Sequence, residues 1–261
     1  MNNSRSFDRA ASFYDRTRPA LDSIAKHGTQ AILDLTGPEA RILEVGAGTG
    51  RISIPLLERG LDWIGCDLSS KMLMRLQEKF PAARIAQADA SRLPFPSAYF
   101  DTVLTAHVLH LVPPWREAIR EFQRVLKPEG VYLNLKTWAT VGISIREKVR
   151  IHWRGWLQGQ GINAFLPGVQ SSEEFRQELE SMGANVRAVE VLRYPLKFTL
   201  REELERFESR VYSDSWEIPD HIFDASLEQL RRWVQDEYGD LDQPREDEVR
   251  FSIDVARLKS P

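Results

Sequence analysis

An apolar segment that runs straight into three closely spaced glycines constrains the fold of this chain more than any other feature of its sequence. Residues 41–45 (RILEV) read as a buried strand, and Gly46, Gly48 and Gly50 follow at alternate positions. Glycines at such a point permit a tight turn and let a ligand lie against the backbone. Residues 51–59 then read as a helix. The pattern predicts a strand, a nucleotide-type loop and a helix, in that order.

Short strands and helices continue to alternate as far as residue 135, which is typical of a parallel sheet covered by helices on both faces. Later residues add a strand at 185–194 and a last strand at 248–258, whose apolar and charged residues alternate. Such alternation suits a half-exposed antiparallel strand near the sheet edge. The fold class predicted is α/β, with a doubly wound, mostly parallel sheet of seven strands, one antiparallel strand and helical insertions. The other expected strands are residues 41–45, 61–67, 84–89, 99–105 and 131–135. Helices are expected at residues 7–35 (broken at Pro19), 51–59, from Ser69 or Ser70 to 79, 115–126, 143–158, from Ser171 to near Gly183, 200–212 and 224–238.

The glycine spacing indicates which ligand the loop holds. A dinucleotide loop places its third glycine three residues after the second, but Arg51 occupies that position here. A phosphate-binding P-loop needs Lys and Ser or Thr after its last glycine, and the chain has Arg51 and Ile52. Glu44 precedes the glycines, where a carboxylate would repel a pyrophosphate and attract an ammonium group. The loop therefore favours a ligand without phosphates.

Two further carboxylates, Asp67 and Asp89, end the next two predicted strands. An acid about 20 residues after such a glycine loop commonly binds ribose hydroxyls. The carboxyl ends of parallel strands share one crevice, so Glu44, Asp67 and Asp89 are expected to line a single ligand. The alternative is that each acid only caps the helix or turn that follows it.

Five segments of the chain resemble the class I, small-molecule type of S-adenosylmethionine-dependent methyltransferases. They are EVGAGTG at 44–50, GCDLSSKML at 65–73, QADASRLPFPSAYFD at 87–101, VLHLV at 108–112 and REFQRVLKPEG at 120–130. FDRAASFYDRTRP at 7–19 resembles the opening segment of this group, which includes methyltransferases of quinone biosynthesis. The resemblance implies a Rossmann-like methyltransferase fold, with S-adenosylmethionine as cofactor and S-adenosylhomocysteine as product. Glu129, in KPEG, departs from the glycine that the family prefers.

The resemblance also implies where each part of the cofactor binds. Glu44, Gly46 and Gly48 would hold its methionyl end, with backbone from Thr105 meeting the ammonium group. Asp67 would bind the ribose, and Asp89 would accept a hydrogen bond from the adenine amino group. The remaining positions are Leu68 and Met72 against the adenosine, Ala90 beside the adenine, and Tyr14 and Arg18 on a lid that closes over the cofactor.

Methyl transfer from a sulfonium needs alignment and a dry pocket more than it needs an acid. A base is required only when the acceptor loses a proton of high pKa, and His107, just past the fourth strand, is the candidate. Packing against a neighbouring helix is an equally good interpretation of His107. Trp138 and Trp153 are candidates for an apolar acceptor pocket, against the alternative of ordinary packing. No metal site is expected.

The net charge of −3 provides no basic field for nucleic acid, and the single Cys66 excludes an internal disulfide. The sequence has no signal-like apolar segment at its start and no apolar run of about 18 residues, so a cytoplasmic protein without membrane contact is expected. We expect one methyltransferase domain over residues 1–261. Its core is residues 36–137, 184–198 and 248–261, and its helical lid and cap are residues 1–35, 138–170 and 199–247.

The function predicted is methyl transfer to a small, partly apolar metabolite. Three alternatives remain open: methylation of a macromolecule such as tRNA or protein, binding of the cofactor without catalysis, and a nicotinamide-dependent oxidoreductase. The sequence predicts neither the acceptor, nor the methylated atom, nor an oligomeric state.

Overall fold

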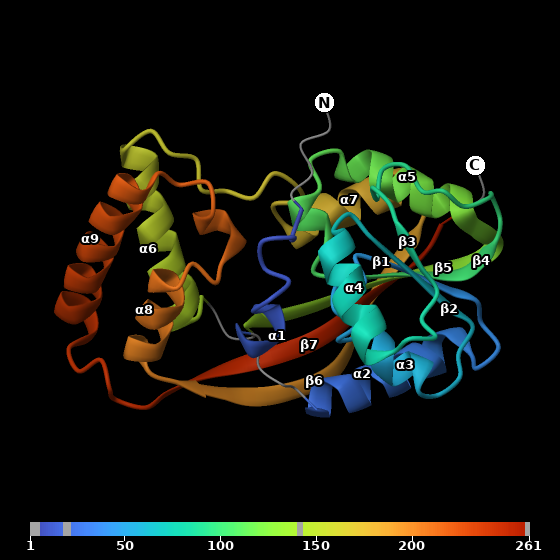
Figure 1. Cartoon of the computed structure of the whole chain (residues 1–261), viewed down its shortest axis with the longest axis horizontal. Helices are drawn as coiled ribbons and strands as arrows, with labels where there is room; N and C mark the ends of the chain where they lie inside the picture. The colour runs from blue at the N-terminus through green and yellow to red at the C-terminus, as the bar shows by residue number, and fades with distance from the viewer. Residues whose placement is uncertain (1–5, 18–21, 140–142, 259–261) are drawn as a thin grey trace. The chain divides into compact units, whose positions relative to one another are not determined.

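A computed structural model describes residues 6–17, 22–139 and 143–258, without the side chains of residues 22–25 and 137–139. The chain forms two compact units. Unit 1 comprises Met1–Thr137, Pro167–Leu192 and Phe251–Pro261, and unit 2 comprises Trp138–Leu166 and Arg193–Arg250. Figure 1 labels the helices and strands of both units. Each unit is described separately below.

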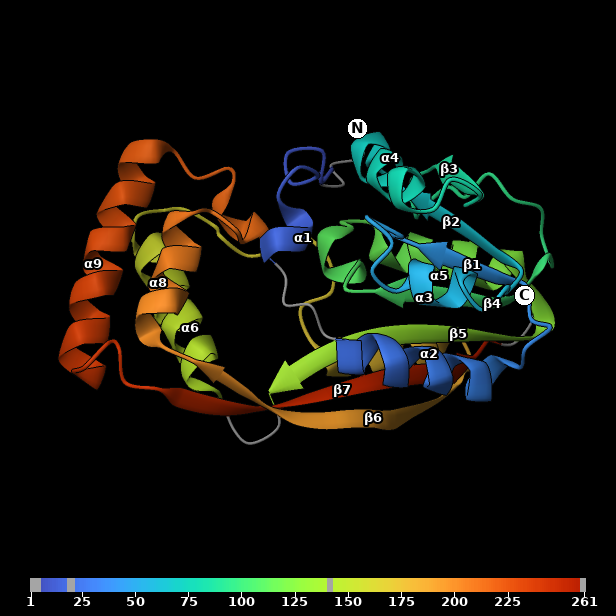
Figure 2. The same ribbon diagram turned by 60° about the horizontal axis from the view of Figure 1, so that its bottom comes forward.

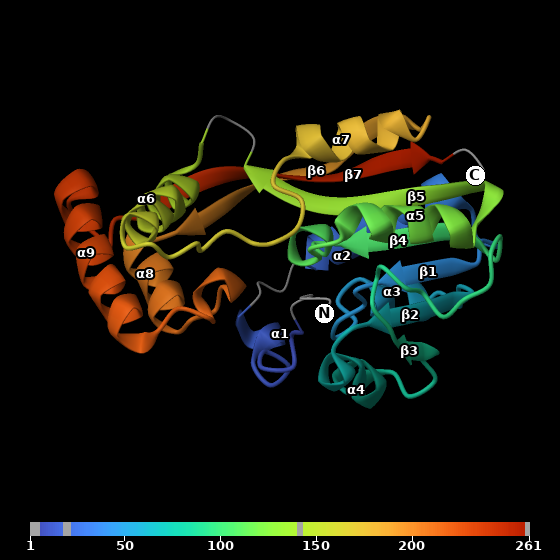
Figure 3. The same cartoon turned by 90° about the horizontal axis from the view of Figure 1, so that it is seen from above.

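Unit 1 is built on the seven-stranded sheet, whose strands follow the order β3-β2-β1-β4-β5-β7-β6. The pairs β1–β2, β1–β4, β2–β3 and β4–β5 are parallel. In Figure 3, β7 runs opposite to β5. The predicted doubly wound, mostly parallel sheet with an antiparallel strand is therefore confirmed. Its strands are β1 (Ile42–Val45), β2 (Trp63–Asp67), β3 (Ile85–Gln87), β4 (Phe100–Ala106), β5 (Leu126–Ala139), β6 (Asn185–Phe198) and β7 (Arg245–Arg257), and β6 and β7 continue into unit 2.

The helices of unit 1 begin and end where local signals place them. Ser69 accepts a hydrogen bond from Met72 N and so caps α4 (Ser70–Lys79), and Ser171 does the same for Glu174 N at the start of α7 (Ser172–Ser181). α5 (Trp115–Val125) follows Pro114 and buries one apolar side in a cluster that it shares with α7 and with β1, β4 and β5. The other helices are α1 (Tyr14–Thr17), α2 (Asp22–Thr36) and α3 (Ser53–Leu57). α3 is shorter than expected because residues 51–52 and 58–60 are turns.

The last strand lies near the sheet edge as predicted, but the half-exposure predicted for it is wrong. β7 lies between β5 and the edge strand β6, and residues 251–256 are all buried. α2 approaches one face so closely that a Cβ on Gly28 would be 3.0 Å from the Phe251 ring, and Figure 2 shows α2 alongside β7. Ala256 belongs to the core cluster on the other face. The charged residues that suggested exposure are Glu248, Arg250, Asp254 and Arg257. Asp254 is buried all the same, paired with Lys136 of β5.

Unit 2 has a hydrophobic core of its own, formed by α6 (Ile145–Gly159), α8 (Leu200–Glu208), α9 (Asp220–Tyr238) and the turn η2 (Ser213–Ser215) with its neighbours. A capping box at Thr199 and Glu202 begins α8, and Arg210, with φ of +47°, follows its end. Buried ion pairs add to the core: Arg146 binds Glu203 at 3.0 Å, and Arg154 binds Asp214 at 2.7 Å. The expected helical insertions are therefore present.

Among the residues that the structure describes, no helix combines the length and the apolar character needed to cross a membrane.

Candidate functional site

The glycine loop after β1 is fastened to its neighbours through the backbone. Gly46 N and Ala47 N donate to the carbonyl of Cys66 in β2, at 2.7 and 3.0 Å. Gly46 has φ of +78°, and a Cβ there would lie 2.2 Å from Val108 Cγ2. Only glycine fits this position, because the loop after β4, which contains Val108, presses against it. The segments that follow β1 and β4 therefore meet as the sequence predicts.

Asp67 joins the glycine loop to the end of β2. Its Oδ2 accepts a hydrogen bond from Gly48 N at 2.9 Å, and its Oδ1 accepts one from Ser69 N at 2.8 Å. Burial raises the pKa of this carboxyl, against the effect of the two backbone donors. A carboxylate is thus fixed where the loop and the strand end meet, next to the start of α4.

Asp89 follows β3 at the same edge of the sheet, since Ala88 N donates to the carbonyl of Asp67 at 3.0 Å. Asp89 Oδ1 accepts hydrogen bonds from the backbone N and the hydroxyl of Ser91, at 2.8 and 2.7 Å. The carboxylate therefore caps its own turn, which is the alternative that the sequence left open, and it is half-buried.

The apolar residues predicted around the adenosine lie on the segments that carry Asp67 and Asp89. Met72 is buried in α4 and Leu68 is half-buried just after β2. Ala90 is buried beside Asp89. The methyl carbon of Met72 is the side-chain atom nearest to Gly48, since a Cβ on that glycine would lie 3.6 Å from it.

Glu44 is enclosed behind the glycine loop instead of projecting from it. The residue is 1% exposed, and its Oε2 accepts hydrogen bonds from Ser53 Oγ at 2.8 Å and Trp63 Nε1 at 3.0 Å. Burial raises its pKa to about 7. These two hydrogen bonds of the carboxylate are to side chains inside unit 1, and its predicted contact with the methionyl end stays a prediction.

The N-terminal segment, residues 6–17, is bound to the glycine loop and to α4 through two carboxylates that sequence reasoning missed. Asp8 Oδ1 accepts from the hydroxyl of Ser69 at 2.5 Å. Asp15 accepts from Thr49 Oγ1 at 2.6 Å and from Lys79 Nζ at 2.7 Å. Lys79 also donates to the carbonyl of Thr49 at 2.8 Å. Only the acids within FDRAASFYDR signalled these contacts in the sequence.

Of the two residues predicted on the lid, Tyr14 lies in this N-terminal segment, half-buried, with its ring 6.1 Å from that of Phe7. Arg18 lies outside the described residues.

Thr105 and His107 stand at the end of β4. Thr105 is fully buried, and its hydroxyl contacts the hydroxyl of Tyr132 at 2.8 Å and Asn134 Oδ1 at 3.1 Å. His107 is exposed and has φ of +57°, in the left-handed region. A histidine held in this rarely used conformation beside the glycine loop is compatible with a role in the reaction.

Trp153 does not line a pocket, so the prediction for it is wrong. It is 1% exposed, its Nε1 donates to Ser226 Oγ at 2.9 Å, and its ring packs edge-on against Phe207 and Phe223 in the core of unit 2. For Trp153, the structure shows ordinary packing, the alternative considered from the sequence. Trp138 lies outside the residues whose side chains the structure describes.

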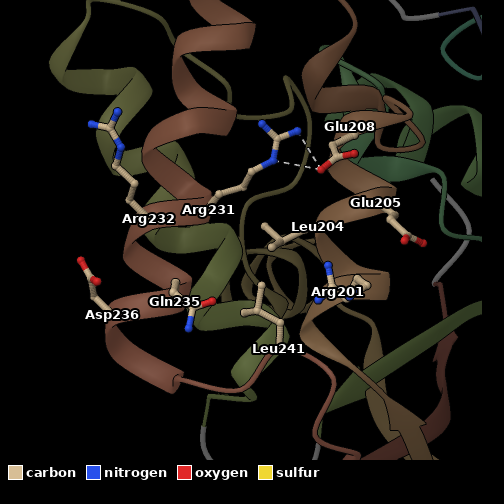
Figure 4. A pocket seen from close by; sticks show the side chains of 9 residues that line it. All are labelled: Arg201, Leu204, Glu205, Glu208, Arg231, Arg232, Gln235, Asp236 and Leu241. Carbon is tan, nitrogen blue, oxygen red and sulfur yellow. Dashed lines mark hydrogen bonds and ion pairs between the residues drawn. The ribbon is translucent and has the colours of Figure 1, made fainter.

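A groove between α8 and α9 of unit 2 is distinct from the glycine loop (Figure 4). Charges of both signs line it, and Arg231 pairs with Glu208 across it at 2.8 Å. It contains neither a glycine loop nor an acid at a strand end, so we assign it no catalytic role. The part of the chain that the structure describes contains no group of three or more His, Cys, Asp or Glu arranged to hold a metal ion.

Comparison with known proteins agrees with this geometry. Residues 43–134 match a family model described as a methyltransferase domain. This part of the chain is a methyltransferase domain. The methyltransferase domain runs from β1 into β5, so it includes the glycine loop, Asp67, Asp89 and His107. The N-terminal segment and unit 2 lie outside it.

Curated relatives of the methyltransferase domain share about a third of its residues. A demethylmenaquinone methyltransferase of Beutenbergia cavernae is 35% identical over 127 residues, or 48% of this chain and 53% of that protein. A phosphatidylethanolamine N-methyltransferase of Cereibacter sphaeroides is 35% identical over 133 residues, or 49% of this chain and 64% of that protein. The matched region thus spans about half the length of the first relative and less than two thirds of the second.

Solved structures extend the likeness beyond the methyltransferase domain. A phosphoethanolamine N-methyltransferase of Haemonchus contortus, solved with S-adenosylhomocysteine and phosphomonomethylethanolamine, aligns with 100% of this chain and 61% of that one. Its TM-score is 0.54 at 18% identity, a level at which the likeness concerns the fold. The Rossmann-like methyltransferase fold predicted from the sequence is confirmed, and residues 43–134 match the predicted family of methyltransferase domains.

Proposed function

We propose that this chain is an S-adenosylmethionine-dependent methyltransferase that acts on a small, partly apolar metabolite. One observation carries the proposal: Asp67, at the end of β2, binds the backbone of Gly48, within the matched methyltransferase domain. A loop with no phosphate-binding pattern and an acid fixed beside it suits a nucleoside with an amino-acid tail better than a dinucleotide.

The residues present fit this cofactor. The methyl group of Met72 stands over Gly48 and offers an apolar surface to an adenosine, with Leu68 nearby on the same segment. The Asp67 carboxylate would accept hydrogen bonds from the ribose hydroxyls in place of those from the backbone. Asp89 and Ala90 would contact the adenine. Gly46, Gly48 and the backbone of Thr105 would hold the methionyl end, with Glu44 as the enclosed acid behind them. Tyr14 would close the site from the N-terminal segment.

S-adenosylmethionine, when bound, supplies a methyl group on a sulfonium whose leaving group needs no acid. The chain's own part is to align the acceptor and to exclude water. His107 is the candidate base because its side chain is exposed next to the segment that touches Gly46. It would take a proton from an acceptor hydroxyl or amine. An acceptor that is already deprotonated would need no base.

The acceptor class is proposed from two sources. The names of the curated relatives give a quinone precursor and a phospholipid as acceptors, both partly apolar. The acidic net charge of −3 disfavours tRNA. We take unit 2 to be an insertion within one methyltransferase domain that helps to select the acceptor, and a cytoplasmic location stays a prediction.

The first experiment is calorimetric titration of the protein with S-adenosylhomocysteine and, separately, with NAD. We expect binding of S-adenosylhomocysteine and none of NAD. NAD binding alone would contradict the proposal. Transfer of a labelled methyl group is then measured with quinol and lipid extracts and with bulk tRNA, and label in tRNA only would favour the macromolecular alternative.

Asp67→Asn tests the cofactor site directly. The variant keeps the shape of the side chain but removes the negative charge of the carboxylate, whose oxygens accept hydrogen bonds from the loop and are expected to accept them from the ribose. Titration should show S-adenosylhomocysteine affinity lowered at least tenfold, or about 1.4 kcal/mol. Asp62→Asn is the matched control, because Asp62 precedes the same strand at its other end and binds Arg41. Equal affinities of the Asp67 variant and the wild type would show that another group holds the nucleoside.

A further inference from the structure

A chain of hydrogen bonds crosses one face of the sheet in unit 1, from β4 to β7. Thr105 Oγ1 donates to Asn134 Oδ1 at 3.1 Å, so its contact with the Tyr132 hydroxyl at 2.8 Å is one in which Tyr132 donates. Asn134 Nδ2 donates to Asp254 Oδ2 at 3.4 Å. Lys136 Nζ forms an ion pair with the same oxygen at 2.5 Å. Every proton in the chain therefore points toward Asp254.

Three members of this network are buried, and Asn134 and Lys136 are half-buried, although strand pairing alone would already join β4, β5 and β7. Thr105 and Tyr132 are fully buried, Asp254 is 3% exposed, and the side chain of Lys136 is 14% exposed. Asp254 Oδ1 is buried and has no hydrogen-bond partner in the described part of the chain. Apolar residues of similar size often replace a buried ion pair without loss of stability. The Lys136–Asp254 pair therefore points to a task other than holding the strands together.

The network lies at the edge of the sheet where ligands of such folds bind. The register pairs Thr105 with Asn134 and Ala106 with Leu135, which puts Lys136 at the carboxyl end of the paired segment. Two residues after Thr105 comes His107 in its left-handed conformation. Movement of Thr105 would shift both the backbone expected to meet the cofactor and the histidine that follows it.

We propose that Lys136 and Asp254 are positioning residues that hold Thr105, through Asn134, in the place that cofactor binding requires. The ionised Asp254 orients the Asn134 amide, the amide oxygen fixes the rotamer of the Thr105 hydroxyl, and the end of β4 keeps one conformation. This proposal rests on the proposed function, because the contact being positioned is the one with the methionyl ammonium group.

The test compares the affinity for S-adenosylhomocysteine, by calorimetric titration, with thermal stability for a set of full-length variants. Lys136→Met and Asp254→Asn each break the ion pair, and Thr105→Val removes the last link while it preserves shape. The double variant with Lys136→Met and Asp254→Leu replaces the pair by apolar groups. The Asn134 amide then loses its acceptor on residue 254, but water can reach it because Asn134 is only half-buried. Lys127→Met is the matched control, because Lys127 lies at the opposite end of β5 from Lys136 and binds Asp101 of β4 at 2.7 Å.

We expect the two single variants and Thr105→Val to bind S-adenosylhomocysteine about tenfold more weakly than the wild type. The double variant should regain most of the melting temperature lost by the single variants and stay about tenfold weaker in affinity. The Lys127 control should bind normally. Recovery of affinity together with stability in the double variant, or unchanged affinity in Thr105→Val, would overturn the positioning role. Failure of the wild type to bind would instead contradict the proposed function.

Discussion

The carboxylate of Glu44 is removed from water beside a loop that is expected to receive a charged ligand. The Ser53 hydroxyl and the Trp63 indole N–H both donate to its Oε2, yet the loss of hydration outweighs them and the pKa rises to about 7. The negative charge of Asp67 contributes in the same direction. Near neutral pH this residue therefore exchanges a proton, although its position inside unit 1 gives it no direct access to solvent.

The shift has a consequence for stability. A carboxyl whose pKa is 4.5 when unfolded and about 7 when folded binds its proton more tightly in the folded state. Its contribution to stability is complete below pH 4.5 and is lost as pH rises through 7, by about 3 kcal/mol in all. Urea unfolding at pH 5 and pH 8 should show the wild type losing more stability across this interval than Glu44→Gln does.

The matched control for this measurement is Glu58→Gln, which changes an exposed carboxylate near the end of α3. Its pH profile should follow that of the wild type. If the Glu44→Gln profile also ran parallel to the wild type, Glu44 would titrate as an ordinary surface acid and the enclosure seen here would not persist in solution.

Among the elements, the N-terminal segment depends on bonds to residues far along the chain. Asp15 binds Thr49 and Lys79, which are 34 and 64 residues away, and Asp8 binds Ser69, which is 61 residues away. Ser69 in turn caps α4 and donates its backbone N–H to Asp67. The segment is thus connected to the glycine loop and to the predicted ribose site, and release of the cofactor is expected to require its movement.

Loosening this segment should speed release of the ligand. Asp15 and Lys79 are partly exposed, so their ion pair contributes less than about 1 kcal/mol. We expect Lys79→Met to raise the dissociation rate of S-adenosylhomocysteine roughly threefold, measured by stopped-flow displacement. Added salt should speed release from the wild type more than from the variant, because salt screens the pair. Arg75→Met is the control, since Arg75 pairs with Glu78 on the same helix, and an identical rate change there would contradict the assignment.

The predictability of each element follows from how local its signals are. The Ser69 and Ser171 caps, the Pro114 start of α5 and the glycine loop act within a few residues, and the sequence located all of them. Asp67 and Asp89 were found because strand ends converge in a parallel sheet. The partners of Asp8 and Asp15, and the pairing of Lys136 with Asp254, depend on tertiary placement and left no local pattern. The burial of residues 251–256 was missed because they include the charged Asp254, whose partner Lys136 is far away in the sequence.

At the scale of the whole molecule, the described residues of each unit bury hydrophobic side chains of their own. The residues proposed to bind the cofactor belong to unit 1, whereas Trp153 and its aromatic neighbours stabilise unit 2. Separate hydrophobic cores in the two units favour unfolding in more than one step. Stability and cofactor affinity are therefore expected to respond separately to changes in unit 2.

Trp153→Ala tests this separation. Loss of a fully buried indole should destabilise unit 2 by about 3–5 kcal/mol, seen as an earlier transition in urea unfolding followed by tryptophan fluorescence. Affinity for S-adenosylhomocysteine should stay within twofold of the wild type. Ile151→Ala, on an exposed part of α6, should change neither quantity. A large loss of affinity in the Trp153 variant would show that the two units are coupled in ligand binding.

The place of β7 in the sheet determines the order in which the protein can be completed during synthesis. β7 is made after both β5 and β6, yet it lies between them in the sheet. If β6 paired with β5 first, it would fill the position that β7 needs. Much of unit 2, including α8 and α9, is made between β6 and β7. The nascent chain must therefore keep one side of β5 open until β7 emerges, and during that interval an unpaired strand edge is exposed to aggregation.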